Sequence, residues 1–334
     1  MPVKFTSRGA IIQELTVAGH NIVLGFDRKE GYDTLNPWFG ATIGRVANRI
    51  RDGIIQSLNG QSYELEKNNA PNALHGGSRG WGRRDFEGPT LLQRNGRDTL
   101  LYTYTSPHRD GGYPGTVEVR VFYAVDEPAQ STADAPTVVD IEFEVELVGP
   151  EAECDETVVN VTNHTYFNLS GAPTIADTQA QLFTQHYLPL DHTGIPHGHI
   201  APYPQPVTDP FAIGPGPDYP VFDDVFVMDH TPDDIQAIPL DTRARPLRPL
   251  AQFRHSGRHL QVLSTEPAFQ FYTGGGTNVP AVGNTPARGP FSGFCIEPSR
   301  FVNAVNEPEW RHMVVLKRGG VYGSRVQYRV WSEQ

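Results

Sequence analysis

Apolar and polar residues alternate strictly along several stretches of the chain, and this pattern predicts its secondary structure. Residues 117–125 carry an apolar side chain at every odd position, and residues 141–147 alternate apolar side chains with three glutamates. The same alternation returns at 326–330. It is typical of antiparallel strands with one buried face and one face in water. The chain is therefore predicted to be all-β.

The sequence contains few signals for helices and none for a domain boundary. The best helical candidate, residues 308–315, is short, so few short helices are expected. Three stretches are predicted to be loops: residues 126–136, 195–220 and 274–293. The last two are long and rich in proline and glycine, and long loops in a compact domain often carry function. With no repeat and no shift in composition, a single domain over residues 1–334 is predicted.

Composition narrows the classes of partner. The 33 glycines and 29 prolines suit many short strands joined by turns. The net charge is −11 and no run is rich in Lys or Arg, which argues against nucleic acid as a partner. No apolar stretch approaches the ~18 residues that span a bilayer, and residues 1–9 lack the core of a signal peptide. These features predict a cytoplasmic protein with no membrane partner.

Cysteine and histidine usage bears on disulfides and metals. Cys154 and Cys295 are too few for a disulfide framework and are predicted to be unpaired thiols. A metal site is an alternative for the only clustered histidines, which are His186, His192, His197 and His199. Their spacing matches no standard zinc arrangement, so no metal site is predicted.

The segment NVTNHTYFNLSG, residues 160–171, is the first candidate for chemistry. In an extended chain one face would carry Asn160, Thr162, His164, Tyr166 and Asn168. The other face would be mostly apolar, with Val159, Val161, Phe167 and Leu169. Such a strand suits the lining of a polar pocket. A histidine that is simply hydrogen-bonded on a half-exposed sheet face fits this segment equally well.

A carboxylate in an apolar setting is the second candidate. Glu297 follows Phe294-Cys295-Ile296 and precedes a proline, so it is expected to end a buried strand. A buried carboxylate is costly unless it is paired or used, and loss of water would raise its pKa and make it a stronger base.

Several other polar residues stand in informative surroundings. His75 precedes two glycines, which would let the backbone turn sharply at a pocket rim. Asn48 and Arg49 can donate hydrogen bonds to adjacent hydroxyls, although a surface ion pair is an alternative for Arg49. Gln270 interrupts an aromatic run, and the pair Asp223-Asp224 precedes the apolar run VFVM.

Taken together, these segments resemble the aldose 1-epimerase family. The matching blocks, in order, are FGATIGRVANRI, NNAPNALHGG, NHTYFNLSG, FDDVFV, SGRHLQVLSTEPAFQFYTGG and CIEPSRFVNAVNEPEW. They span residues 39–310, nearly the whole chain. The resemblance implies a large antiparallel β-sandwich with a sugar site in a cleft on one sheet, whereas alternation alone could not choose a sandwich over a barrel.

The resemblance also implies roles for individual residues. His164 would be the general acid and Glu297 the general base. Substrate hydroxyls would be held by Asn48, Arg49, His75, Asp223 and Gln270, and Tyr166 would line the site. Asp223 matches the family position better than its neighbour Asp224. The reaction needs no metal, nucleotide or redox cofactor, and its partner is a small-molecule sugar; the protein is expected to be a monomer or a homodimer.

The implied activity is interconversion of the α and β anomers of free aldohexoses such as glucose and galactose. Its pH dependence should be bell-shaped, with Glu297 setting the acid limb and His164 the alkaline limb. Should Glu297 not be the base, Asp224 and Glu266 are the next candidates.

Three alternatives remain at this stage. The first is a related epimerase that acts on a non-sugar lactol or on a phosphorylated sugar, the phosphate being held by Arg79, Arg83 and Arg84. The second is a glycoside hydrolase that uses Glu297 and Asp223. The third is a non-catalytic sugar-binding module, which would not need a matched acid and base.

Overall fold

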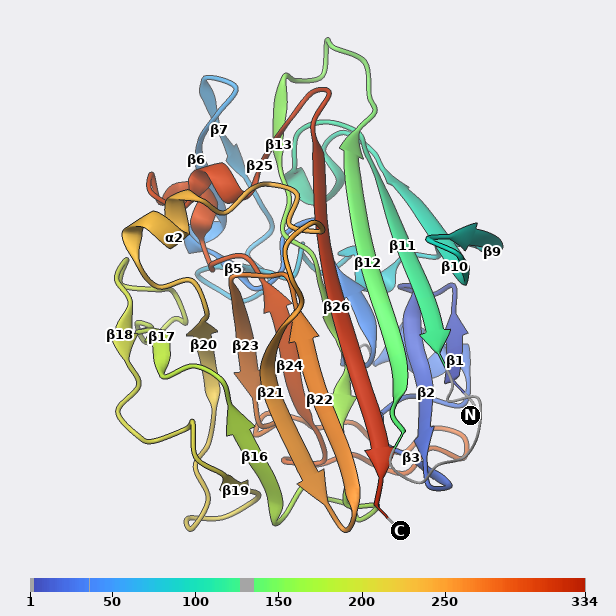
Figure 1. The fold of residues 1–334 in the computed structure, drawn as a ribbon. Helices are drawn as coiled ribbons and strands as arrows, with labels where there is room; N and C mark the ends of the chain where they lie inside the picture. The colour runs from blue at the N-terminus through green and yellow to red at the C-terminus, as the bar shows by residue number, and fades with distance from the viewer. Residues whose placement is uncertain (1–2, 36, 127–134, 334) are drawn as a thin grey trace.

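The computed structural model describes residues 3–35, 37–126 and 135–333, and its named elements are mostly antiparallel strands (Figure 1). A nine-stranded sheet runs in the order β19 (Phe211–Ile213), β16 (Thr178–Leu182), β21 (Arg248–His255), β22 (Arg258–Ser264), β26 (Val321–Ser332), β12 (Thr137–Leu147), β11 (Val117–Asp126), β10 (Arg97–Ser106) and β9 (Glu87–Arg94). A six-stranded sheet runs in the order β15 (Tyr166–Phe167), β24 (Phe294–Ser299), β23 (Ala268–Tyr272), β20 (Asp223–Val227), β17 (His186–Leu188) and β18 (Ala201–Pro202).

Smaller elements surround these two sheets. A three-stranded sheet contains β1 (Val3–Thr6), β2 (Ile11–Val17) and β3 (His20–Asn21). Four strand pairs join β4 (Ala41–Ile43) to β14 (Thr162–His164), β5 (Arg49–Ile50) to β8 (Ala73–Leu74), β6 (Ile54–Leu58) to β7 (Gln61–Glu64), and β13 (Glu156–Val158) to β25 (Val315–Lys317). The helices are α1 (Lys29–Thr34) and α2 (Pro232–Gln236), with short 3₁₀ turns at Arg51–Gly53, Trp81–Arg83, Asp110–Gly112, Ala304–Asn306 and Arg311–Met313.

The two large sheets pack face to face around the main core, as a sandwich does (Figure 1). Rings from the six-stranded sheet contact rings from the nine-stranded sheet: the centroids of Phe294 and Phe253 are 4.1 Å apart, and those of Phe167 and Tyr328 are 5.1 Å apart. The predicted all-β sandwich with few short helices is thus confirmed.

The alternation that predicted the strands also predicts their faces. Val117, Val119 and Val121 of β11 lie in the core. The glutamates of β12 point the other way, where they form ion pairs with Arg94, Arg120 and Arg243. Strands β11 and β12 therefore each bury one face and turn the other toward solvent.

The three loop predictions had different outcomes. Residues 195–220 contain the short strands β18 and β19, so that prediction is wrong in part. Residues 274–293 contain no named strand and only isolated bridges such as Val279 with Arg288. Of the third stretch, 127–134 lie outside the described residues. The helix considered at 308–315 is a single 3₁₀ turn, and across the described ranges no helix is long and apolar enough to cross a membrane.

Candidate active site

The outer face of the six-stranded sheet forms the floor of the site. Along β23, Phe269 and Phe271 point into the sandwich core, so Gln270 between them points outward. Along β24, Phe294 and Ile296 likewise point inward and Glu297 outward. Register then pairs Gln270 with Glu297 across the two strands. A two-residue period thus brings an amide and a carboxylate side by side on the face away from the core.

The N-terminal half of the chain forms a wall above this floor. Strand β5 pairs with β8, which places Asn48 and His75 opposite each other. The His75 backbone N–H donates to the Asn48 carbonyl over 3.0 Å, and the Asn48 backbone N–H donates to His75 Nδ1 over 3.2 Å. Both residues have positive φ. Gly76, directly after His75, lies so close to Gly44 that a Cβ on Gly76 would be 2.0 Å from the Gly44 carbonyl oxygen. The glycine after His75 is therefore required for the close approach that sets the imidazole in place.

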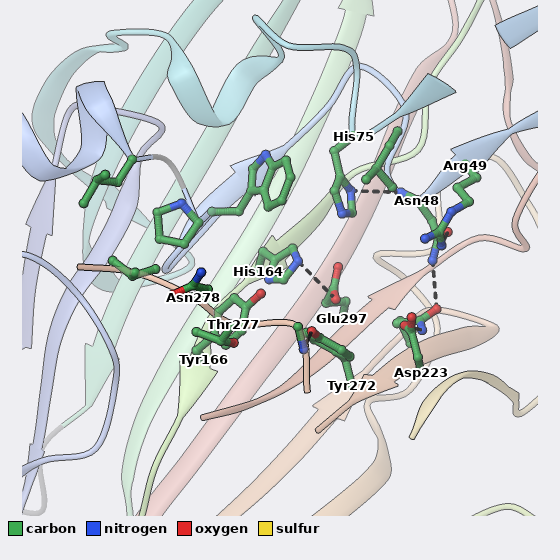
Figure 2. A pocket seen from close by; sticks show the side chains of 17 residues that line it. Asn48, Arg49, His75, His164, Tyr166, Asp223, Tyr272, Thr277, Asn278 and Glu297 are labelled. Atoms are coloured by element: carbon green, nitrogen blue, oxygen red, sulfur yellow. Dashed lines mark hydrogen bonds and ion pairs between the residues drawn. The ribbon is translucent and has the colours of Figure 1, made fainter. Parts of the chain in front are cut away.

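These elements enclose a pocket of about 300 Å³ (Figure 2). All eight residues predicted for the site line it: Asn48, Arg49, His75, His164, Tyr166, Asp223, Gln270 and Glu297. They come from six segments that are separate in the sequence and that only the fold brings together.

His164 and Glu297 face each other inside the pocket. Nε2 of His164 lies 3.4 Å from Oε1 of Glu297, and each side chain is only 5% exposed (Figure 2). Burial, supported by the negative charge of Asp223 and opposed by Arg49, raises the pKa of Glu297 to about 8. Burial lowers the pKa of His164 to about 3. Near neutral pH the pair therefore holds one proton, and that proton rests on the carboxyl group.

This order of pKa values is the reverse of the sequence-based expectation, which is thus wrong. Loss of the pair's proton at high pH is set by Glu297, and gain of a second proton at low pH is set by His164. The reason is that burial destabilises the charged form of both groups, which raises the pKa of an acid and lowers that of a base.

His75 is held as a neutral hydrogen-bond donor. Because its Nδ1 accepts from the Asn48 backbone, the ring proton must be on Nε2. Burial, with the nearby His164 and Arg49 adding to it, keeps the pKa of His75 well below its usual value. A neutral imidazole with a fixed N–H suits contact with a hydroxyl oxygen.

A chain of hydrogen bonds crosses the floor from the wall to the rim. Nδ2 of Asn48 donates to Oε1 of Gln270 over 2.8 Å, and Nε2 of Gln270 donates to Oδ1 of Asp223 over 2.7 Å. Arg49 is oriented by Asn69, whose Oδ1 accepts from Nε over 3.0 Å. Asp223 reaches solvent at the rim. Partial loss of water around its carboxyl nevertheless raises its pKa, against the opposing effects of Arg49 and of the hydrogen bond from Gln270. Asn48, Gln270 and Asp223 thus form a hydrogen-bonded row of side chains, the polar row, along the floor of the pocket.

Two details of the prediction were wrong. Glu297 does not end its strand, because β24 continues to Ser299. Of the five polar residues expected on one face of 160–168, only His164 and Tyr166 line the pocket. The amides of Asn160 and Asn168 bond backbone carbonyls instead, because the segment breaks into β14 and β15, which pair with different strands.

The sequence interpretation also missed residues that line the pocket. Trp38, Tyr272 and the loop residues Thr277, Asn278 and Val279 all do so. The loop was predicted to carry function, but nothing singled out these members. Tyr272 shares the outward face of β23 with Gln270 and could have been found by counting two residues along the strand.

Metal binding was considered for the histidines of 186–199, and none of them lines the pocket, although His192 lines the neighbouring cavity. His186 stacks on His230 with ring centroids 3.7 Å apart, and the rings of His197 and His199 are 6.4 Å apart. In the part of the chain that the structure describes, the one group of three side chains that could converge on a cation is His75, His164 and Glu297, with ligand atoms within 4.8 Å of one another. The predicted thiols Cys154 and Cys295 are both free and buried.

A β-sandwich with a buried His–Glu pair beside a row of hydrogen-bonding side chains has the groups that acid–base chemistry on a polar ligand requires. The chain belongs to the aldose 1-epimerase family, whose model matches residues 1–329. It is 36% identical to the galactose mutarotase of Sus scrofa, over 90% of this chain and 81% of that protein. It is also 33% identical to the bifunctional protein gal10 of Schizosaccharomyces pombe, over 100% of this chain and 44% of that protein.

The chain thus spans less than half the length of the bifunctional relatives. Among solved structures, galactose 1-epimerase from Lactobacillus acidophilus has the same fold, with a TM-score of 0.78 at 21% identity, over 99% of this chain and 91% of that one.

Proposed function

We propose that this protein is an aldose 1-epimerase that interconverts the α and β anomers of free aldohexoses such as glucose and galactose. The observation that carries the proposal is the contact between His164 and Glu297, 3.4 Å apart and almost fully buried beside a row of hydroxyl-binding groups. Family membership and the similarity to galactose mutarotases support it.

The chemistry requires one acid and one base. A cyclic aldose changes anomer when its ring opens to the aldehyde and closes again on the other face of C1. Opening needs a proton delivered to the ring oxygen and a proton removed from the C1 hydroxyl. An acid and a base held on either side of these atoms can carry out both transfers on the bound sugar, without two separate collisions in solution. In the proposed assignment His164 delivers the first proton and Glu297 removes the second. Closure on the opposite face returns both.

The resting pair already holds the number of protons that this assignment needs. Its proton rests on Glu297 before the reaction, and transfer to His164 across 3.4 Å yields a cationic acid and an ionised base without any exchange with solvent. The two forms differ only in the position of one proton, and the pKa values favour the form with the proton on Glu297, so the bound sugar must stabilise the charged form.

The remaining pocket residues are proposed to bind the sugar. Asn48, Arg49 and His75 present donors, Asp223 presents an acceptor, and Gln270 can do both. Tyr166 stacks on the His164 ring with centroids 5.0 Å apart, which fixes the acid. Monomer or homodimer, a single domain, the absence of a cofactor and a cytoplasmic location stay predictions of the sequence.

A phosphorylated substrate is disfavoured by charge. None of Arg79, Arg83 and Arg84 lines the pocket, and Arg84 forms an ion pair with Asp110. The neighbouring cavity of about 690 Å³, which shares Arg49 and Asp223 with the pocket, adds Asp191 and Asp224. A phosphate would therefore meet several carboxylates.

Polarimetry tests the proposal directly. Freshly dissolved α-glucose and α-galactose should approach their equilibrium rotation faster with the protein than without it, and the same assay with a 6-phosphate sugar should show slower turnover. No acceleration with either free sugar would contradict the proposal, and a clear preference for the phosphate would move it to the phosphorylated branch.

A further inference from the structure

Besides the polar row, the pocket has apolar lining residues that the proposed mechanism leaves without a role. These residues include Leu35, Pro37 and Trp38. Trp38 is only partly buried, so a ligand in the pocket can reach its indole. The pocket is thus lined both by hydrogen-bonding groups and by a flat aromatic surface.

The indole lies against both histidines of the site. Its centroid is 5.1 Å from that of His75 and 6.1 Å from that of His164, and it is nearly parallel to the His164 ring, with 19° between the planes. A pyranose ring whose C1 and ring oxygen reach His164 and Glu297 would lie close to this indole.

The backbone conformation that holds Trp38 in this place is unfavourable for a bulky residue. Its φ is +59°, in the left-handed region that bulky residues rarely adopt. The turn is closed by the Ala41 N–H, which donates to the Trp38 carbonyl over 3.0 Å, and is tied to the acid's strand by the Gly40 N–H, which donates to the His164 carbonyl over 3.0 Å. Strain of this kind persists where the surroundings over-determine it, and it concentrates at ligand-binding sites.

Resting on the proposed function, we propose that Trp38 is a substrate-contacting residue, whose indole packs against the C–H face of the sugar ring next to its reducing carbon. A pyranose has hydroxyls at its edge and C–H groups on its faces. The polar row takes the hydroxyls, and the negative face of the indole attracts the polarised C–H groups while excluding water from the histidines.

Intrinsic fluorescence gives a readout that does not depend on turnover. The chain has four tryptophans, and Trp38 is the one that lines the pocket. Trp81 and Trp310 are buried elsewhere, and Trp331 lies on the nine-stranded sheet, stacked on His259 at 4.9 Å. Glucose or galactose should therefore cause a saturable change in emission in the wild type and in the matched control Trp331→Phe, and this change should be lost in Trp38→Phe.

Kinetics supply the second arm. In Trp38→Leu, which keeps bulk but removes the aromatic face, KM for glucose should rise about three- to tenfold, as expected for loss of one aromatic contact, with kcat changing less. A sugar-dependent emission change that persists in Trp38→Phe, its absence from the wild type, or an unchanged KM in Trp38→Leu would each overturn the proposal. Failure of the proposed function is seen separately, as wild-type protein that does not accelerate mutarotation.

Discussion

Two buried glutamates, each followed by a proline, have opposite surroundings in this molecule. Glu266 is 0% exposed, forms an ion pair with the equally buried Arg300, and accepts a hydrogen bond from the Tyr322 hydroxyl over 3.3 Å. Glu297 is 4% exposed and, among the described residues, its one ion-pair partner is His164, a neutral ring near pH 7.

The difference separates a carboxylate that holds the fold together from one that is kept available for chemistry. Arg300 also donates to the carbonyls of Met313, Leu240 and Gly323, so the Glu266 pair joins several segments. Within the described ranges Glu297 has no ion pair with an arginine or lysine, and burial, supported by the charge of Asp223 and opposed by Arg49, raises its pKa to about 8. Buried charges that are neither paired nor neutralised are costly, and active sites are where proteins tolerate them.

The largest expected effect is on turnover in Glu297→Gln, which keeps size and hydrogen bonding but removes the proton acceptor. The rate of mutarotation should fall by about 10²–10⁴-fold, and His164→Asn should act similarly, since the ring oxygen would then leave without a proton. Sugar binding should remain in both variants, because the polar row is intact. Polarimetry and a binding titration check this. Retention of more than about a tenth of the rate in Glu297→Gln would show that another residue is the base.

Glu266→Gln should damage the fold rather than the chemistry. Removing one member of a buried ion pair leaves Arg300 uncompensated, which typically costs about 3–5 kcal/mol of unfolding free energy. Chemical denaturation measures this loss, and the rate per folded molecule should stay within a few-fold of the wild type. A large loss of rate with unchanged stability would reverse the roles assigned to the two glutamates.

Asp223→Asn should act on binding and, through charge, on the base. It removes a hydroxyl acceptor, so KM should rise about tenfold, in line with a lost charged hydrogen bond. It also removes a negative charge that raises the pKa of Glu297, so the alkaline limb of the pH profile should move to lower pH. A rise in KM with no movement of the limb would show that Asp223 does not influence Glu297.

The last expected effect is on the pH dependence of stability. In the folded protein Glu297 holds its proton up to about pH 8, whereas in the unfolded chain its pKa is near the ordinary glutamate value of 4.5. Between these values the folded state binds the extra proton, so its contribution to stability is complete below about pH 4.5 and is lost as pH rises to about 8. Glu297→Gln should therefore gain thermal stability relative to the wild type as pH rises through this window. A difference in Tm that does not vary with pH would contradict the raised pKa.

The sequence predicted the sheets well and the contrast between the glutamates only partly. Strict alternation is local, so it identified β11, β12 and the C-terminal strand, and it would have placed Gln270 and Glu297 on outward faces. Glu266-Pro267 and Glu297-Pro298 look alike in sequence, because what separates them is Arg300, which only the folded chain brings to Glu266.

The site itself was predicted mainly through the resemblance to a family. Eight residues from distant segments converge on one pocket, and no local pattern contains that information. Trp38 was not predicted from the sequence for the same reason. Its proposed role depends on a left-handed turn and on contact with two histidines, which are 37 and 126 residues away in the chain.

The protonation state of Glu297 is the central claim, and infrared difference spectroscopy across a pH titration tests it most directly. A protonated carboxyl band should be present at neutral pH and disappear with a midpoint near pH 8 in the wild type. The band should remain in Glu266→Gln and be absent from Glu297→Gln. A wild type without a carboxyl group titrating near pH 8, or a band that disappears with Glu266 instead of Glu297, would contradict the account.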